Sequence, residues 1–271
     1  IKIQSDQISP VIKKIIKPSP KRISPECPHF EDCGSCDHQN IGYPDQLFYK
    51  EAIFSEALKR EGIVLPPEPI MVGSAESLYY RNTIRFFFLL DKSNQITFGR
   101  HSYLGYGKYT PISQCLLQSR KCNKYLDILK SAINHQVDDK TALWQLRIRE
   151  GKNTGEFMIE VITLIQPDNS GSQISGLSGM TPIGLHGLTL KSCVLSSLKP
   201  FPEIKSIYLT TAFDKNMIKL RRTLIGGSPV IREKIGSFTF QISPESFFQT
   251  NSGGAKTLYD KVKEFARISP N

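Results

Sequence analysis

The chain has 271 residues, of which 39% are hydrophobic and 22% are charged. This composition is that of a globular protein with one or two domains, and no apolar run is long enough to span a bilayer. Lysine and arginine number 35 against 25 aspartate and glutamate residues, and the net charge of +10 indicates an anionic partner, with nucleic acid as the first candidate.

The first 25 residues are basic and rich in proline. The segment VIKKIIK (11–17) predicts one short strand, and the prolines after it predict a stiff, extended linker. A strand without a partner nearby suggests the end of a preceding domain. The amino-terminal residues contain no apolar stretch of the kind found in signal peptides, so we expect a cytoplasmic protein.

Three cysteines stand close together in the segment CPHFEDCGSC, and a fourth lies far downstream in PISQCLLQ. Cys27, Cys33 and Cys36 have the spacing C-x5-C-x2-C, and Cys115 is the remote thiol. Such groups of thiolates hold soft metals or iron–sulfur clusters. The spacing favours a [4Fe-4S] cluster over structural zinc, because zinc sites prefer two short cysteine pairs; zinc stays open as the alternative. Disulfides are disfavoured, because a chain of this length can bury a core without them.

Hydrophobic periodicity and turn residues predict interspersed helices and strands. The expected elements are, in order, a helix at 44–60, strands at 84–90, 95–99 and 108–115, a helix at 122–133, strands at 143–150, 156–165, 205–213 and 238–243, and a helix from about 251. Residues 167–190 show no clear period and are expected to form a long surface loop. The turn residues at 91–94 predict a hairpin between the strands at 84–90 and 95–99. The apolar faces expected of the three helices are, in order, Leu47, Phe54, Ala57 and Leu58; Cys122, Tyr125, Leu126, Leu129 and Ile133; and Ala255, Leu258, Tyr259, Val262, Phe265 and Ala266. The sequence therefore predicts an α+β fold with a mixed, largely antiparallel sheet and flanking helices.

The segment from Tyr79 to Lys108 combines arginines with aromatic residues. Arg81 and Arg85 are four residues apart, a spacing that places both on one face of a strand. Guanidinium groups match phosphate oxygens, and aromatic rings stack on unpaired bases. The pattern indicates an RNA contact; a core of aromatic residues rimmed by arginines is the alternative.

A second candidate site is SPESFFQTN (243–251), where Gln249 precedes the start of the last helix. Such a junction presents backbone donors and a side-chain amide to a ligand. The alternative is a capped helix in which Phe247 and Phe248 are core residues.

These segments, taken together and in order, resemble the RNA (uracil-5-)-methyltransferase family, and in particular its iron–sulfur branch that modifies 23S ribosomal RNA. The matching segments are residues 17–50, YYRNTIRFFF, PISQCLLQ, LRIREGKNTGEFMIEVIT and FTFQISPESFFQTNSGGAKTLYDKV. The resemblance implies that Cys27, Cys33, Cys36 and Cys115 bind a [4Fe-4S] cluster. It also implies that Gln249 contacts S-adenosylmethionine, and that Arg81, Arg85 and Phe247 lie near the RNA.

The resemblance also implies a domain organisation. Residues 1–25 would be the end of a TRAM-like β-barrel and a linker, 26–62 the cluster-stapled segment, 63–242 a central α+β domain, and 243–271 the approach to a Rossmann-like catalytic domain that we expect to be absent. The implied function is part of an S-adenosylmethionine-dependent enzyme that forms 5-methyluridine, and we expect this chain alone to be inactive. The alternative is a non-enzymatic RNA-binding module stapled by zinc or a cluster.

Overall fold

The computed structural model describes residues 2–4, 7–9, 14–64, 71–105, 107–165 and 185–267. The chain divides into two compact units. The first comprises residues 1–30 and 36–73, and the second comprises residues 31–35 and 74–271. Among the described residues, no helix has the length and apolar character needed to cross a membrane.

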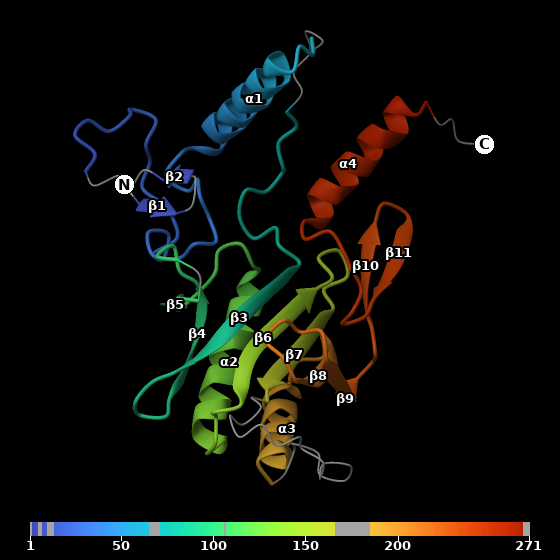
Figure 1. Cartoon of the computed structure of the whole chain (residues 1–271). Helices are drawn as coiled ribbons and strands as arrows, with labels where there is room; N and C mark the ends of the chain where they lie inside the picture. The colour runs from blue at the N-terminus through green and yellow to red at the C-terminus, as the bar shows by residue number, and fades with distance from the viewer. Residues whose placement is uncertain are drawn as a thin grey trace. The chain divides into compact units, whose positions relative to one another are not determined.

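The first unit contains a short hairpin and one long helix. Strands β1 (Lys2–Gln4) and β2 (Gln7–Ser9) pair antiparallel, and helix α1 spans Tyr43–Arg60 (Figure 1). The expected helix is thus confirmed: it carries a proline in its first turn, and the chain leaves it through Gly62 at a φ of 72°. Its expected apolar face is not buried, since no residue of α1 is. The strand expected at 11–17 is absent from the part of it that the structure describes, residues 14–17.

Seven strands of the second unit form one sheet in the order β5-β4-β3-β6-β7-β8-β9. Their bounds are β3 (Thr83–Leu90), β4 (Ile96–His101), β5 (Tyr109–Ile112), β6 (Leu143–Glu150), β7 (Phe157–Leu164), β8 (Ile204–Ala212) and β9 (Leu220–Gly227). All neighbours are antiparallel except β7 and β8, which are parallel. The predicted β3–β4 hairpin is confirmed. The Asp91 carboxylate closes its turn by accepting hydrogen bonds from the backbone N–H groups of Ser93 and Gln95 at 2.8 and 2.9 Å.

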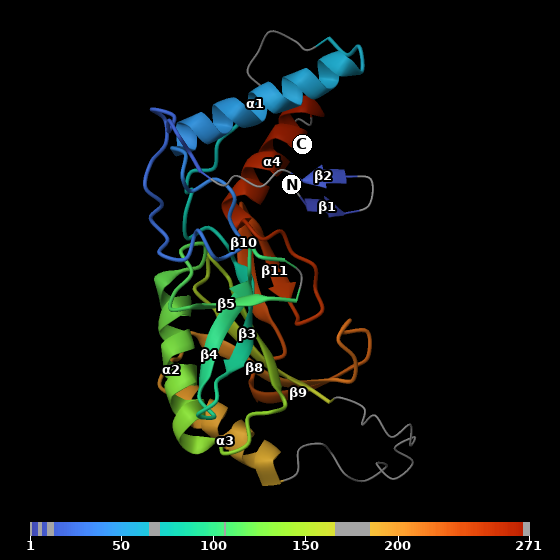
Figure 2. The same ribbon diagram turned by 60° about the vertical axis from the view of Figure 1, so that its left-hand side comes forward.

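Two helices, α2 (Arg120–Gln136) and α3 (Leu185–Leu198), pack against each other and cover one face of this sheet (Figure 2). The side chains that α2 buries are those predicted from the helical spacing: Cys122, Tyr125, Leu126, Leu129 and Ile133. Alternate residues of the central strands supply the opposite half of this core, among them Ile84, Phe86, Leu146, Ile148, Ile159 and Val161. The residues between them point to the other face of the sheet.

The fold class expected from the sequence was wrong. The expectation was an α+β domain with a mixed, largely antiparallel sheet, flanking helices, a cluster-stapled amino-terminal segment and no Rossmann-like part; residues 167–190 were expected to form a surface loop. The sheet is mixed, but α3 begins at Leu185 and leads into β8, which lies parallel to β7, so the chain contains a β-α-β unit of the kind from which Rossmann-like folds are built. Periodicity missed α3 because apolar and small residues are spread around LHGLTLKSCVLSSL without a polar stripe. Residues 166–184 lie outside the described residues.

In the part of the second unit that the structure describes, one end of the other face of the sheet is covered. Strands β10 (Ile231–Ile235) and β11 (Phe238–Ile242) form a hairpin, and helix α4 (Ser252–Phe265) follows. A small second core covers that end of the sheet and consists of Met158, Tyr208, Ile231, Ile242 and Phe248.

Helix α4 exists as predicted, but its predicted buried stripe is wrong. Only Ser252 and Ala255 of α4 are buried, whereas the expected stripe residues Leu258, Tyr259, Val262, Phe265 and Ala266 are exposed.

Candidate nucleic-acid interface

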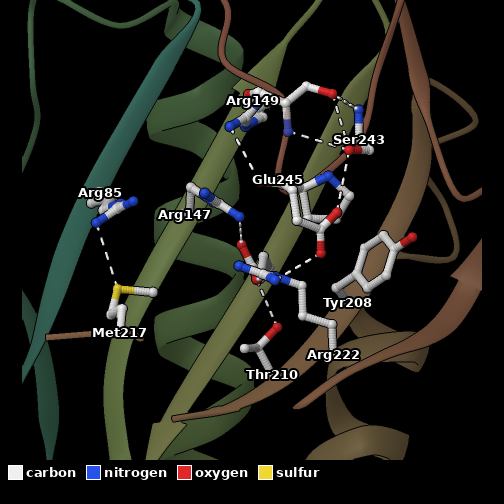
Figure 3. A network of polar contacts seen from close by, with 12 residues as sticks. Arg85, Arg147, Arg149, Tyr208, Thr210, Met217, Arg222, Ser243 and Glu245 are labelled. Carbon is white, nitrogen blue, oxygen red and sulfur yellow. Dashed lines mark hydrogen bonds and ion pairs between the residues drawn. The ribbon is translucent and has the colours of Figure 1, made fainter. Parts of the chain in front are cut away.

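Strand register gathers arginines on the face of the sheet that the helices leave uncovered. Arg85 of β3 lies directly opposite Arg147 of β6, and Arg149 of β6 lies opposite Thr83. Because side chains two apart on a strand share a face, Arg85, Arg147 and Arg149 project from the same surface. Figure 3 shows these three guanidinium groups on neighbouring strands.

This surface contains a pocket of about 470 Å³. Its lining residues are Arg81, Thr83, Ile84, Arg85, Phe87, Arg100, His101, Gln145, Arg147, Arg149, Ser246, Phe247, Phe248 and Thr250. Five of these are arginines, and none of the described lining residues is an aspartate or a glutamate. The pocket is therefore built for an anion.

A buried carboxylate beneath the pocket neutralises part of this charge. Glu160 of β7 is 0% exposed; it forms ion pairs with Arg147 and, at 3.1 Å, with Arg222. It also accepts a hydrogen bond from the hydroxyl of Thr210 at 2.6 Å. Arg222 in turn bonds the carboxylate of Glu245 at 2.7 Å (Figure 3). One buried charge is thus shared between two arginines.

The guanidinium of Arg149 connects the sheet to the segment that forms the pocket wall. It donates to the backbone oxygens of Ser246 and Pro244 at 2.8 and 3.3 Å. Burial, and then the positive charge of Arg147, lower the pKa of Arg149 to about 10, and burial also lowers the pKa of Arg147. Both shifts have the direction expected where guanidinium groups are buried close to one another.

Aromatic rings form the side of the pocket next to β4 and β5. Phe87 lies 4.8 Å from His101 and 4.2 Å from Tyr109, measured between ring centroids, and His101 and Tyr109 are 5.3 Å apart. On the opposite side, the ring of Phe247 is 85% exposed. Exposed rings beside guanidinium groups are suited to unpaired bases on a charged backbone.

A buried polar network fixes the segment that carries Phe247 and Gln249. The side-chain amide of Asn82 donates to the backbone oxygen of Gln249 at 2.7 Å and to the hydroxyl of Ser252 at 2.9 Å. Ser252 donates onward to Glu233, at 2.6 Å. Glu233 is 0% exposed and also accepts the backbone N–H groups of residues 152–153 and 234. The network holds the backbone of Gln249 and not its side-chain amide. The side chain of Gln249 is exposed and does not line the pocket.

The structure divides the four predicted cluster ligands between the two units. Cys27 and Cys36 belong to the first unit, and Cys33 and Cys115 belong to the second. Cys33 forms an isolated bridge with Ser102, and the Cys115 backbone exchanges hydrogen bonds with the side chain of Asn123 at 2.9 and 3.1 Å. Among the described residues, no three His, Cys, Asp or Glu side chains are grouped so that they could hold a metal ion.

Of the predicted RNA-contact residues, Arg81, Arg85 and Phe247 all line the same pocket, although they come from segments about 160 residues apart in the sequence. Arg147 and Arg149 were missed. Their signal was present in LRIRE, where arginines alternate with buried apolar residues, which indicates a strand with a charged face.

Comparisons with known proteins show which class of protein the chain resembles. No protein-family model matches the chain. It is 29% identical, over 97% of its length, to an uncharacterised RNA methyltransferase of Clostridium acetobutylicum, of which it covers 56%. It is also 30% identical, over 94% of its length, to the 23S rRNA (uracil(747)-C(5))-methyltransferase of Pyrococcus horikoshii, of which it covers 55%. The chain is thus similar to RNA methyltransferases, and it spans little more than half the length of these relatives.

These matches confirm the resemblance to the RNA (uracil-5-)-methyltransferase family. A solved structure agrees in fold: the tRNA (uracil-54, C5)-methyltransferase of Pyrococcus abyssi, in complex with S-adenosyl-L-homocysteine, matches with a TM-score of 0.62 at 23% identity. The match covers 93% of this chain and 53% of the other. The expected fold class, which had no Rossmann-like part, is therefore corrected, because 93% of this chain shares the fold of that methyltransferase. No comparison supports the expectation that this chain alone is inactive.

Proposed function

We propose that this chain is part of an S-adenosylmethionine-dependent enzyme that methylates C5 of uridine in RNA, and that the pocket on β3 and β6 contacts the RNA. The observation that carries the proposal is the pocket lined by five arginines and by no described carboxylate. The comparisons support the proposal because one relative, which matches 94% of this chain, is named a 23S rRNA uracil-C5 methyltransferase. A ribosomal RNA target and a cytoplasmic location are part of this proposal.

In this proposal, Arg81 and Arg85 bind the RNA backbone and Phe247 stacks on a base. A base in a duplex is not accessible to an enzyme that reacts at its ring, so the target must leave its stack. A ring that is 85% exposed at the mouth of a charged pocket can replace a lost stacking partner. Base–aromatic stacking is worth about 1–3 kcal/mol per base.

S-adenosylmethionine would supply the methyl group, and Gln249 is the proposed contact of this chain with it. The support is the sequence resemblance together with the way the structure holds this residue. The Gln249 backbone is fixed by Asn82, while its side chain is exposed and available to a ligand. No step of the reaction is assigned to any other residue of the chain.

The proposal of a [4Fe-4S] cluster on Cys27, Cys33, Cys36 and Cys115 is supported by the spacing of the thiols and by the sequence resemblance. Iron and acid-labile sulfide analysis of protein purified without oxygen tests it, with zinc measured on the same sample. About four irons and four sulfides per chain would support the cluster. Zinc without iron or sulfide would refute it.

Two assays test the proposed function. Incubation with RNA and S-adenosylmethionine carrying a labelled methyl group should place the label on C5 of uridine, and ribosomal RNA should be the better substrate than transfer RNA. RNA binding measured over a range of salt concentrations should weaken steeply as salt rises, because phosphate contacts release counterions. Tight RNA binding without methyl transfer would instead indicate a non-enzymatic RNA-binding module.

A further inference from the structure

The pairing of Arg85 with Arg147 is unfavourable in the protein by itself. The two residues are direct cross-strand partners, and like charges at such positions destabilise a sheet. The contacts found for Arg85 do not offset this, because its Nη1 lies 3.5 Å from the thioether sulfur of Met217, which is a weak acceptor. Arg147 is 5% exposed, so water does not screen its charge well, and its ion pair with Glu160 offsets only part of the repulsion because Arg222 shares that carboxylate.

The carboxylates nearby do not balance the arginines. Among the described ion pairs, Arg147 and Arg222 share Glu160, and Arg222 also pairs with Glu245. Four arginines, Arg85, Arg147, Arg149 and Arg222, thus stand beside two carboxylates, which leaves an excess of two positive charges, four minus two. Arg81 lines the same pocket and adds to this excess.

Several donors of these arginines are also buried without a hydrogen-bond partner. The Nε groups of Arg81, Arg147 and Arg149 are in this position. A buried donor without a partner costs free energy, and in native proteins nearly all such groups are satisfied. These three donors add to the unfavourable free energy of crowding guanidinium groups at this surface.

We propose that Arg85 and Arg147, together with Arg81 and Arg149, form a subsite for a single phosphate group of the RNA backbone. This inference rests on the proposed function, and it names the chemical group that the pocket binds. A phosphodiester offers two charged oxygens that match the fork of a guanidinium, and its charge offsets the Arg85–Arg147 repulsion. His101 also lines the pocket, and its exposed ring is where the base of the same nucleotide can stack.

The test uses the whole 271-residue chain and three ligands: the dinucleotide UpU, uridine, which has no phosphate, and inorganic phosphate. We expect UpU and phosphate to raise the Tm of the wild-type protein and uridine to have little effect. The variant Arg85→Gln should weaken UpU binding about tenfold and lower the salt slope of RNA binding by about 1. The same variant should have a higher Tm than wild type without ligand, because it removes the like-charge pair. Arg85→Lys keeps the charge and loses the fork, so its UpU affinity should be intermediate.

The matched control is Arg221→Gln. Arg221 is also an exposed arginine on a strand, but its guanidinium lies over the ring of Phe213, at 5.8 Å, and not in the pocket. The subsite is refuted if the Arg85→Gln and Arg221→Gln variants bind UpU and RNA with equal affinity while the wild type binds RNA tightly. The proposed function would still stand in that case. Binding of phosphate at the pocket without any binding of RNA would support the anion subsite and refute the proposed function. Binding of neither would refute both.

Discussion

The buried carboxylate of Glu160 is the group on which the charged face of the sheet depends most. We expect Glu160→Gln to destabilise the protein by about 3–5 kcal/mol, the cost typical of removing one partner of a buried ion pair. The side chains of Glu160 and Arg147 are 0% and 6% exposed, so the charge left on Arg147 cannot be solvated by water. The substitution keeps the shape of the side chain, and the loss is therefore electrostatic.

Urea denaturation measures this change as a lower midpoint at an unchanged slope. The control is Glu245→Gln, which removes an ion pair with Arg222 whose carboxylate is 61% exposed. Exposed pairs contribute less than about 1 kcal/mol, so this variant should unfold close to wild type. The double variant Glu160→Gln/Arg147→Met should recover part of the stability, because it also removes the unpaired charge. A loss below about 1 kcal/mol for Glu160→Gln, or strictly additive losses in the double variant, would refute the reasoning.

Three further predictions concern other parts of the second unit. Asn82→Ala should cost about 2 kcal/mol in urea denaturation, because two hydrogen bonds are lost and the buried hydroxyl of Ser252 loses its donor; no change would show that the network does not hold the segment. Phe247→Ala should weaken RNA binding by about 1–3 kcal/mol and leave the unfolding midpoint unchanged, since the ring is 85% exposed; lost stability would place the ring in the core. Hydrogen bonds from the backbone and from the Tyr125 hydroxyl, the latter at 2.8 Å, lower the pKa of the Glu203 carboxyl. The ionised carboxylate therefore stabilises the folded protein at pH values above its unfolded-state pKa, and this contribution is lost as the pH falls through its folded-state pKa. Wild type should therefore lose more stability than Glu203→Gln on acidification, and equal losses would contradict this.

Local sequence patterns predicted much of the sheet and helix α2, which packs on it. The spacing of Cys122 to Ile133 identified the buried face of α2, and the turn residues after β3 identified its hairpin with β4. These predictions hold because they depend on neighbours in the sequence. The same reasoning failed for α3, which lacks a polar stripe, and for α4, whose apolar residues Leu258 and Phe265 are exposed. A hydrophobic stripe shows which side of a helix is apolar, and not what covers it.

The sequence by itself determined that this is a basic chain with arginines and aromatic residues in one segment, and its motifs carried the resemblance to uracil-C5 methyltransferases. It did not determine that Arg81, Arg85, Arg147 and Phe247 meet in one pocket. That depends on strand register, which sets Arg85 opposite Arg147, and on the buried Asn82, which holds the backbone next to Phe247. Register and long-range packing are tertiary properties, because they join residues that no local pattern connects.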